Sequence, residues 1–219
     1  MGKEIDLLVN YPKTKRNLEE RVASKTEADR AVARQFGHEF FDGNRNHGYG
    51  GFNYFPRFWQ PVIPAFQQHW GLDKNSSVLD VGCAKGFMLH DFVELIPGIT
   101  VKGVDVSEYA IEHAMDNVKP YLQRACATKL PFPDNSFDVT ISINTVHNLE
   151  YEECAQALQE VERVSRKGSF ITVDAYRTQE EKERMDAWNL TAKTIMSTDE
   201  WVEFFKKVRY TGDYFWFIP

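Results

Sequence analysis

Short apolar runs alternate with amphipathic stretches through the middle of the chain. The runs rich in β-branched residues predict buried strands near residues 77–82, 100–107, 137–144 and 169–176, with a weaker strand near 122–127. Between them, apolar residues at helical spacing predict helices near 87–96, 108–118 and 151–166. This alternation predicts an α/β fold: a doubly wound, mostly parallel sheet with helices on both faces.

The first third of the chain departs from this alternation. Residues 17–40 are rich in helix-forming Glu, Arg, Ala and Lys, residues 40–59 crowd glycines among aromatic side chains, and a helix is expected within 57–70. We therefore expect a helical, aromatic N-terminal cap and lid over residues 1–72. It would sit on a core formed by residues 73–219, the two making one structural domain.

The C-terminal part carries a second departure. The order S-T-D-E at Ser197–Glu200 is a capping-box pattern and predicts the start of a helix. A turn at Thr211–Gly212 and the β-prone run YFWFIP follow. We expect a closing strand here, paired antiparallel at one edge of the sheet.

Composition and charge narrow the class of protein. The 219 residues carry a net charge of −6, so a basic face for nucleic acid is not expected. No apolar stretch approaches the length of a membrane span, and the first residues lack the pattern of a signal peptide. The three cysteines are odd in number and widely spaced, which predicts neither a disulfide framework nor a metal site. A cytoplasmic protein without nucleic-acid or membrane partners is expected.

The stretch LDVGCAKGF carries the first candidate chemistry. Gly82 and Gly86 follow a predicted strand whose next-to-last residue is Asp80, and a helix is expected from Phe87. Glycines allow a tight turn and a close approach of backbone to a ligand, and the helix start adds oriented N–H groups. Asp105 ends the next predicted strand, about 20 residues after the loop, where a carboxylate can accept hydrogen bonds from ribose hydroxyls.

The spacing of the loop glycines distinguishes between two kinds of cofactor-binding loop. A dinucleotide loop reads G-x-G-x-x-G, whereas this loop reads G-x-A-x-G after Asp80. It resembles motif I, D-x-G-x-G-x-G, of the class I S-adenosylmethionine-dependent methyltransferases, which have a Rossmann-like fold. The runs VKGVDVSEYAIEHA, ATKLPFPDNSFDVTISINTVHNL and ALQEVERVSRKGSFITVDAY resemble later blocks of the same family. The resemblance covers residues 77–175 and is closest to the small-molecule group that includes ubiquinone and menaquinone methyltransferases.

This resemblance implies S-adenosylmethionine as the cofactor and S-adenosylhomocysteine as the product. It also implies in-line transfer of a methyl group to an O or N atom of a small-molecule acceptor. The implied cofactor-binding residues are Asp80, Gly82, Cys83, Ala84, Gly86, Phe87, Asp105, Val106, Cys126, Ala127, Thr128 and Asn144.

Two of these residues depart from the family pattern. Ala84 replaces the central glycine, and we expect its position to accept a methyl group without a positive φ. Cys126 stands where the family usually has an aspartate that bonds the adenine amino group. Backbone groups of Ala127, or Cys126 itself, are the alternative adenine contacts. Loss of the aspartate would weaken cofactor binding by about 1.5–3 kcal/mol.

Fewer sequence features indicate which residues bind the methyl acceptor. His147, just past the fourth main strand, is the candidate general base, with a packed core histidine as the alternative. The implied acceptor contacts are Tyr49, Tyr54, Trp59, Asn148 and Tyr176. Residues 47–59 are expected to form a lid with Gly48, Gly50 and Gly51 as hinges. For Phe52, Phe55 and Phe58 simple packing on the sheet is the favoured alternative.

Two other function classes stay open. An NAD-type oxidoreductase is disfavoured by the loop spacing. A non-catalytic protein that binds S-adenosylmethionine or S-adenosylhomocysteine on the same scaffold is motivated by Ala84 and Cys126. The sequence identifies neither the acceptor molecule nor the oligomeric state.

Overall fold

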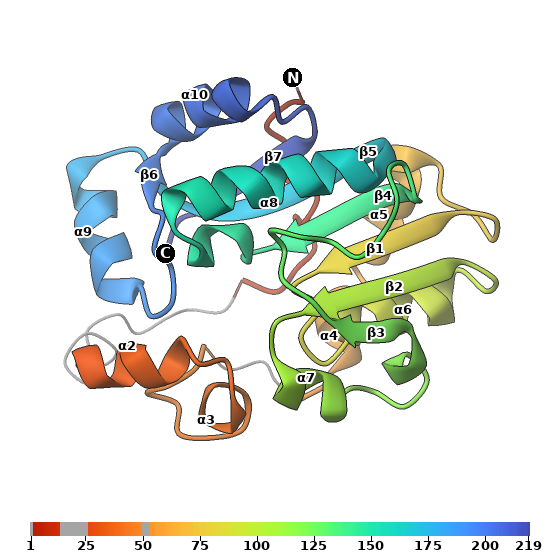
Figure 1. Ribbon diagram of the computed structural model, residues 1–219, viewed down its shortest axis with the longest axis horizontal. Coiled ribbons are helices and arrows are strands. Elements are labelled where there is room, and N and C mark those ends of the chain that lie inside the picture. Colours follow the sequence, from red (N-terminus) through yellow and green to blue (C-terminus); the bar gives the residue numbers. More distant parts are fainter. Residues whose placement is uncertain (1, 14–25, 50–52) are drawn as a thin grey trace.

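The computed structural model describes residues 2–13, 26–49 and 53–219. Seven strands of this part form one sheet in the order β3-β2-β1-β4-β5-β6, with β7 also beside β5 (Figure 1). The strands are β1 (Ser77–Val81), β2 (Thr100–Asp105), β3 (Leu122–Arg124), β4 (Phe137–Ile143), β5 (Ser165–Tyr176), β6 (Met196–Ser197) and β7 (Asp213–Phe217). Their pairings are parallel, which confirms the predicted doubly wound α/β sheet.

Helices cover both faces of this sheet (Figure 1). Side chains of α5 and α6 pack on one face, and those of α8 and α10 pack on the other. The helices are α2 (Glu27–Ala33), α3 (His38–Phe41), α4 (Pro56–Trp59), α5 (Ile63–Trp70), α6 (Phe87–Leu95), α7 (Glu108–Glu112), α8 (Tyr151–Val164), α9 (Gln179–Trp188) and α10 (Thr198–Val208), with 3₁₀ turns η1 (Lys119–Tyr121) and η2 (Val146–Asn148). Helix α7 is shorter than predicted, and α9 was not predicted. Within the described ranges, none of these helices is long and apolar enough to cross a membrane.

The C-terminal edge differs from the prediction. Strand β7 runs parallel to β5, with Phe170 opposite Asp213 and Asp174 opposite Phe217. The predicted antiparallel edge is therefore wrong. Strand β6 pairs with the carboxyl end of β5, and α10 starts there and carries the chain back toward the amino end. The strand that follows α10 must then run in the same direction as β5.

The start of α10 was predicted correctly. The Ser197 side chain accepts a hydrogen bond from the backbone N–H of Glu200, and the Glu200 carboxylate accepts one from the backbone N–H of Ser197. This is a reciprocal capping box, and it fixes where the chain turns from β6 into the helix.

The cap is built from short helices. Of the helix predicted over 17–40, residues 17–25 lie outside the described residues, and the remainder contains α2 and most of α3. Phe36, with a φ of +49°, interrupts the helical backbone between them. The two helices lie beyond the carboxyl ends of the strands (Figure 1). They therefore stand over the edge of the sheet where ligands bind in doubly wound folds.

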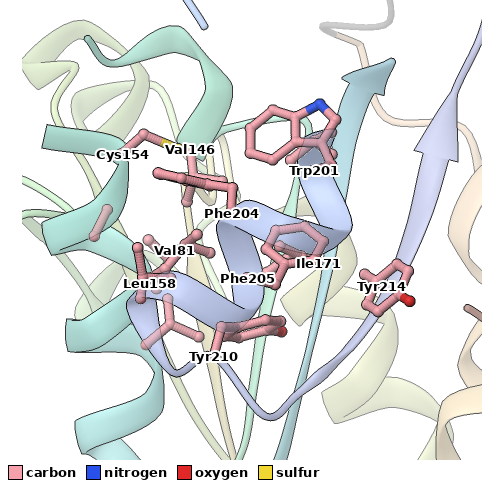
Figure 2. Close-up of a cluster of buried hydrophobic side chains, with 14 of the residues drawn as sticks. Val81, Val146, Cys154, Leu158, Ile171, Trp201, Phe204, Phe205, Tyr210 and Tyr214 are labelled. Atoms are coloured by element: carbon pink, nitrogen blue, oxygen red, sulfur yellow. The ribbon is translucent and has the colours of Figure 1, made fainter. Parts of the chain in front are cut away.

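Helix α10 fills the core on one face of the sheet (Figure 2). Trp201 and Phe205 are fully buried there, and Phe204 is nearly so. Trp201 also donates a hydrogen bond from its indole Nε1 to the backbone oxygen of Asp174, 2.9 Å away. This helix therefore holds the carboxyl end of β5 in place.

Asp138 ties together the amino ends of three strands. Its carboxylate accepts hydrogen bonds from the backbone N–H and the hydroxyl of Ser77, and it pairs with Arg166 and Lys167. Burial alone would raise its pKa, but these partners outweigh burial and lower the pKa to about 2.

This lowered pKa predicts an acid-dependent loss of stability. The stabilisation by Asp138 is fully present above the unfolded-state pKa of about 3.8 and is lost as the pH falls toward the folded-state value of about 2. Urea unfolding at pH values from about 5 to about 2 should show a steeper fall in wild-type unfolding free energy than in Asp138→Asn. Parallel curves for the two proteins would contradict this assignment.

Candidate functional site

The predicted cofactor residues converge at one edge of the sheet. Strands β3, β2, β1 and β4 are neighbours, and the candidate residues lie at or just beyond their carboxyl ends. The segment from Asp80 to Phe87 spans the end of β1 and the start of α6. Asp105 ends β2 and Val106 follows it, Cys126 to Thr128 follow β3, and Asn144 follows β4.

Both glycines of the β1–α6 loop are required by their backbone and surroundings. Gly82 has a φ of +85°, and a Cβ there would lie 2.1 Å from Oγ1 of Thr145. Gly86 has a φ of +77°, and a Cβ there would lie 2.9 Å from a methyl carbon of Val118. Because left-handed backbone and close contacts both exclude a side chain, the loop keeps glycine at these two positions.

Ala84 corrects one expectation. Its φ is +48°, so this position does adopt the left-handed conformation that we expected it to avoid. This conformation accompanies a contact with the neighbouring strand, since the N–H of Ala84 donates a hydrogen bond to Oδ2 of Asp105, 2.8 Å away. A non-glycine residue in this conformation is strained. The hydrogen bond to Asp105 helps to hold it there.

Asp105 is held on both of its carboxylate oxygens. Oδ2 accepts from Ala84, and Oδ1 accepts from the backbone N–H of Ser107 at 2.8 Å. Burial raises the pKa of Asp105, although these backbone donors oppose the rise. The side chain of Val106, beside it, is 49% exposed. A nucleoside fits this arrangement, because its ribose can contact the fixed carboxylate of Asp105 and its flat base can contact the exposed side chain of Val106.

Asp80 is a buried acid on the strand that leads into the loop. It is 4% exposed, and among the described residues no hydrogen bond stabilises its charged form. Burial and the nearby Asp105 raise its pKa well above its usual range. A buried carboxylate without a partner is costly, so this position fits a ligand that carries a positive charge.

The residues after β3 and β4 complete the rim of the site. Cys126 is exposed, and its Sγ lies 3.1 Å from Oγ1 of Thr128. Asn144 leaves β4 with a φ of +51°, and its Oδ1 accepts a hydrogen bond from Oγ1 of Thr172 at 2.9 Å. Asn148 donates to the backbone oxygen of Asn144, but its own Oδ1 is buried with no partner among the described residues. This orphaned oxygen can accept a hydrogen bond from a bound molecule.

His147 lies in the core rather than in an open site. It is 3% exposed, and its Nδ1 accepts a hydrogen bond from the backbone N–H of Asp174 at 2.9 Å. Its Nε2 lies 3.7 Å from Oδ1 of Asp174. Burial lowers its pKa to about 3, so the ring is neutral near pH 7, with its proton on Nε2. This environment favours the alternative of a packed histidine, and the role of general base stays a prediction.

The burial of His147 gives a second prediction. The ring resonances of His147 are expected to stay constant from pH about 8 to about 5, because protonation of the buried ring is disfavoured. Two-dimensional NMR of histidine ring protons tests this, with His147→Gln used to assign the signals. A titration of the His147 signal within that range would return the ring to the list of candidate bases.

The predicted acceptor residues of the cap are held by different elements. Oη of Tyr49 accepts hydrogen bonds from the backbone N–H groups of Leu190 and Thr191 just after α9. Tyr54 donates to Oδ1 of Asp91 on α6 at 2.7 Å, and Trp59 packs on the ring of Tyr11. A small hollow is lined by Tyr11, Asn53, Tyr54, Phe55, Phe58, Trp59 and Phe87.

The remaining acceptor prediction lies farther along the sheet. Tyr176 ends β5 and donates to Glu200 at the start of α10, beyond β4 and away from the β1 loop. Of the expected lid, Gly48 is buried, whereas the hinges Gly50 and Gly51 and also Phe52 lie outside the described residues. The structure thus brings the cofactor candidates together more clearly than the acceptor candidates.

Two residues of this region were not predicted. Asp174 is buried near the carboxyl end of β5, beside His147. An acid near the end of a strand was the signal used for Asp80 and Asp105, and the same signal was present in TVDAY. Lys85 lies inside the loop, but its partner is 43 residues away in the sequence, so the loop alone gave no indication of its role.

The central part of the chain is similar to a known protein family. Residues 79–173, which run from β1 through the loop and Asp105 into β5, match the family model of a methyltransferase domain. This part of the chain is a class I methyltransferase domain. Its family uses S-adenosylmethionine as the methyl donor. The match includes the positions on which the resemblance was based.

Individual relatives agree with this membership. The methyltransferase domain is 36% identical over 107 residues to a demethylmenaquinone methyltransferase of Symbiobacterium thermophilum. It is 34% identical over 106 residues to the uncharacterized methyltransferase YcgJ of Bacillus subtilis. Each match covers 45% of this chain, but only 42% and 40% of the two relatives. The chain thus matches less than half the length of these relatives.

Solved structures support the fold. The crystal structure of YcgJ superposes with a TM-score of 0.53 and 22% identity, covering 67% of this chain and 66% of YcgJ. That of the [4+2]-cyclase SpnF superposes with a TM-score of 0.55 and 20% identity, covering 73% of this chain and 59% of SpnF. The fold of the methyltransferase domain is therefore shared with a protein named as a cyclase, so function has to be argued from the site.

Proposed function

We propose that the protein transfers a methyl group from S-adenosylmethionine to an O or N atom of a small-molecule acceptor. The observation that carries this proposal is the pairing of Asp105 with the loop. Its carboxylate is held by the N–H of Ala84 on one side and that of Ser107 on the other. This arrangement fixes a ribose-binding acid beside a glycine loop, as a nucleoside cofactor requires.

The residues of the site fit the parts of this cofactor. Asp80, a buried acid whose charged form no hydrogen bond from the described residues stabilises, would hold a positively charged part of it. Asp105 would accept the ribose hydroxyls. The adenine ring would lie against Val106 and the segment from Cys126 to Thr128, and Asn144 would border the methionine end. Because no acid replaces the missing aspartate at Cys126, we expect adenine to bind through backbone groups or through Cys126 itself.

The cofactor, when bound, supplies a methyl group activated by the positive charge on its sulfur. The protein's own part is to orient the acceptor and exclude water. We assign Oδ1 of Asn148 to accept a hydrogen bond from the acceptor's O–H or N–H, since this atom is buried and lacks a partner among the described residues. The neutral His147 supports the carboxyl end of β5 through its contacts with Asp174.

A non-catalytic binding protein is the second candidate function. Two observations favour it: the left-handed Ala84 in the cofactor loop and the loss of an acid at Cys126. Both would weaken cofactor binding without preventing it. The free, widely spaced cysteines fit a reducing cytoplasmic location for either function.

Radiolabelled S-adenosylmethionine separates these candidates. The protein would be incubated with the labelled cofactor and with pools of small hydroxyl-bearing and amine-bearing compounds, followed by separation of the labelled products. Label in a product, absent with Asp105→Ala, supports methyl transfer. Tight binding of the cofactor with no labelled product from either pool supports the binding protein instead.

A further inference from the structure

The cap meets the cofactor loop through a buried lysine. Lys85 follows Ala84 in the loop and is only 7% exposed, although lysine is rarely buried unless it is paired. Its Nζ lies 2.7 Å from each carboxylate oxygen of Asp42, which caps the end of helix α3. A charge-assisted contact to both oxygens is a strong link between the cap and the loop.

Tyr109 of helix α7 contacts both Asp42 and Lys85. Its hydroxyl donates to Oδ2 of Asp42 at 2.7 Å, and Nζ of Lys85 lies 6.0 Å from the centre of its ring. The ring also stacks on Phe41 and meets the edge of His38, both on α3. Burial alone would raise the pKa of Asp42, but the hydrogen bonds from Lys85 and Tyr109 outweigh burial and lower it. Asp42 is therefore charged near pH 7.

A second contact joins the cap to the end of β2. The hydroxyl of Ser107 donates to the backbone oxygen of Phe36, just before α3, at 2.5 Å. The backbone N–H of the same serine donates to Asp105. The cap thus contacts both segments whose N–H groups orient Asp105: the loop, through Lys85, and the start of α7, through Ser107 and Tyr109.

We propose that Asp42, Lys85 and Tyr109 are positioning residues that couple docking of the cap to cofactor binding. This inference rests on the proposed function, because it takes Asp105 as the ribose-binding residue. When the cap is docked, its contacts hold in place the two segments that orient Asp105. Coupling between two events is reciprocal, so a bound cofactor favours the docked cap to the same degree. Loosening of the cap should therefore speed release of the product.

The test uses tritium-labelled S-adenosylhomocysteine bound to the full chain and chased with the unlabelled compound. Asp42→Asn keeps the shape of the side chain but removes its charge. It should speed dissociation by about tenfold, because it weakens the partly buried ion pair that holds the docked cap against the cofactor loop. Asp42→Glu, which restores the charge, should recover part of the slow release. Tyr109→Phe removes a single hydroxyl and should give a smaller increase, so the test does not depend on one variant folding.

The matched control is a residue of α7, the helix that carries Tyr109. Glu108 pairs with Arg124 at the surface, 3.4 Å apart, and both side chains are more than half exposed. Glu108→Gln should leave the dissociation rate unchanged. Equal rates for wild type, Asp42→Asn and Tyr109→Phe would overturn the coupling and leave the proposed function intact. Failure of the wild-type chain to bind S-adenosylhomocysteine would overturn the proposed function and the coupling together.

Discussion

Replacing Asp105 with alanine is expected to weaken binding of S-adenosylhomocysteine on the order of 100-fold. The change removes the proposed acceptor of the ribose hydroxyls. It also removes the partners of two backbone donors, the N–H groups of Ala84 and Ser107. Since each hydrogen bond to a charged group contributes about 1.5–3 kcal/mol, loss of two such bonds to ribose accounts for this effect. Calorimetric titration measures it directly.

The control for this prediction is a carboxylate outside the site. Asp116 follows α7 and is exposed, so Asp116→Ala should bind the ligand as wild type does. Asp105→Asn should bind more tightly than Asp105→Ala, because an amide oxygen can still accept one of the hydrogen bonds. Wild-type affinity in Asp105→Ala would remove Asp105 from the cofactor site.

Replacing Trp201 with alanine is expected to lower the free energy of unfolding by about 3–5 kcal/mol. The side chain is fully buried beside β5, where it packs on Phe204 and Phe205 (Figure 2). Alanine would leave a cavity and remove the hydrogen bond to the backbone oxygen of Asp174. Urea unfolding at neutral pH measures the loss, since the slope of the transition shows whether two-state behaviour is kept.

Two variants separate the contributions to this loss. Trp201→Phe keeps most of the apolar volume and should cost less than alanine, mainly through the lost hydrogen bond to Asp174 at about 0.5–1.5 kcal/mol. Leu95→Ala removes a side chain that is 42% exposed and should cost less than about 1 kcal/mol. If Trp201→Ala were no less stable than Leu95→Ala, the described packing of α10 would be incorrect.

Local sequence patterns were sufficient for much of the sheet. The apolar runs marked the main strands because buried parallel strands are apolar on both faces. The capping box at Ser197 located the start of α10 because its hydrogen bonds lie within four residues. Asp105 was found for a similar reason: the distance from a loop glycine to the next strand end is set by one helix and one strand.

The features that the sequence did not predict depend on contacts between distant segments. The direction of β7 follows from β6, a strand of only two residues with no recognisable pattern. The left-handed backbone of Ala84 accompanies its hydrogen bond to Asp105 on another strand. The burial of His147 depends on the chain near Asp174, and the role of Lys85 depends on Asp42 in the cap. None of these partners lies close in sequence to the residue it controls.

Calorimetric titration of the wild-type chain with S-adenosylhomocysteine, S-adenosylmethionine and NAD tests the central claim most directly. The account predicts saturable binding of both adenosyl compounds at one site per chain, with no comparable binding of NAD. The G-x-A-x-G loop with Asp105 behind it is the structural reason for that difference. Binding of NAD with neither adenosyl compound bound would contradict the account.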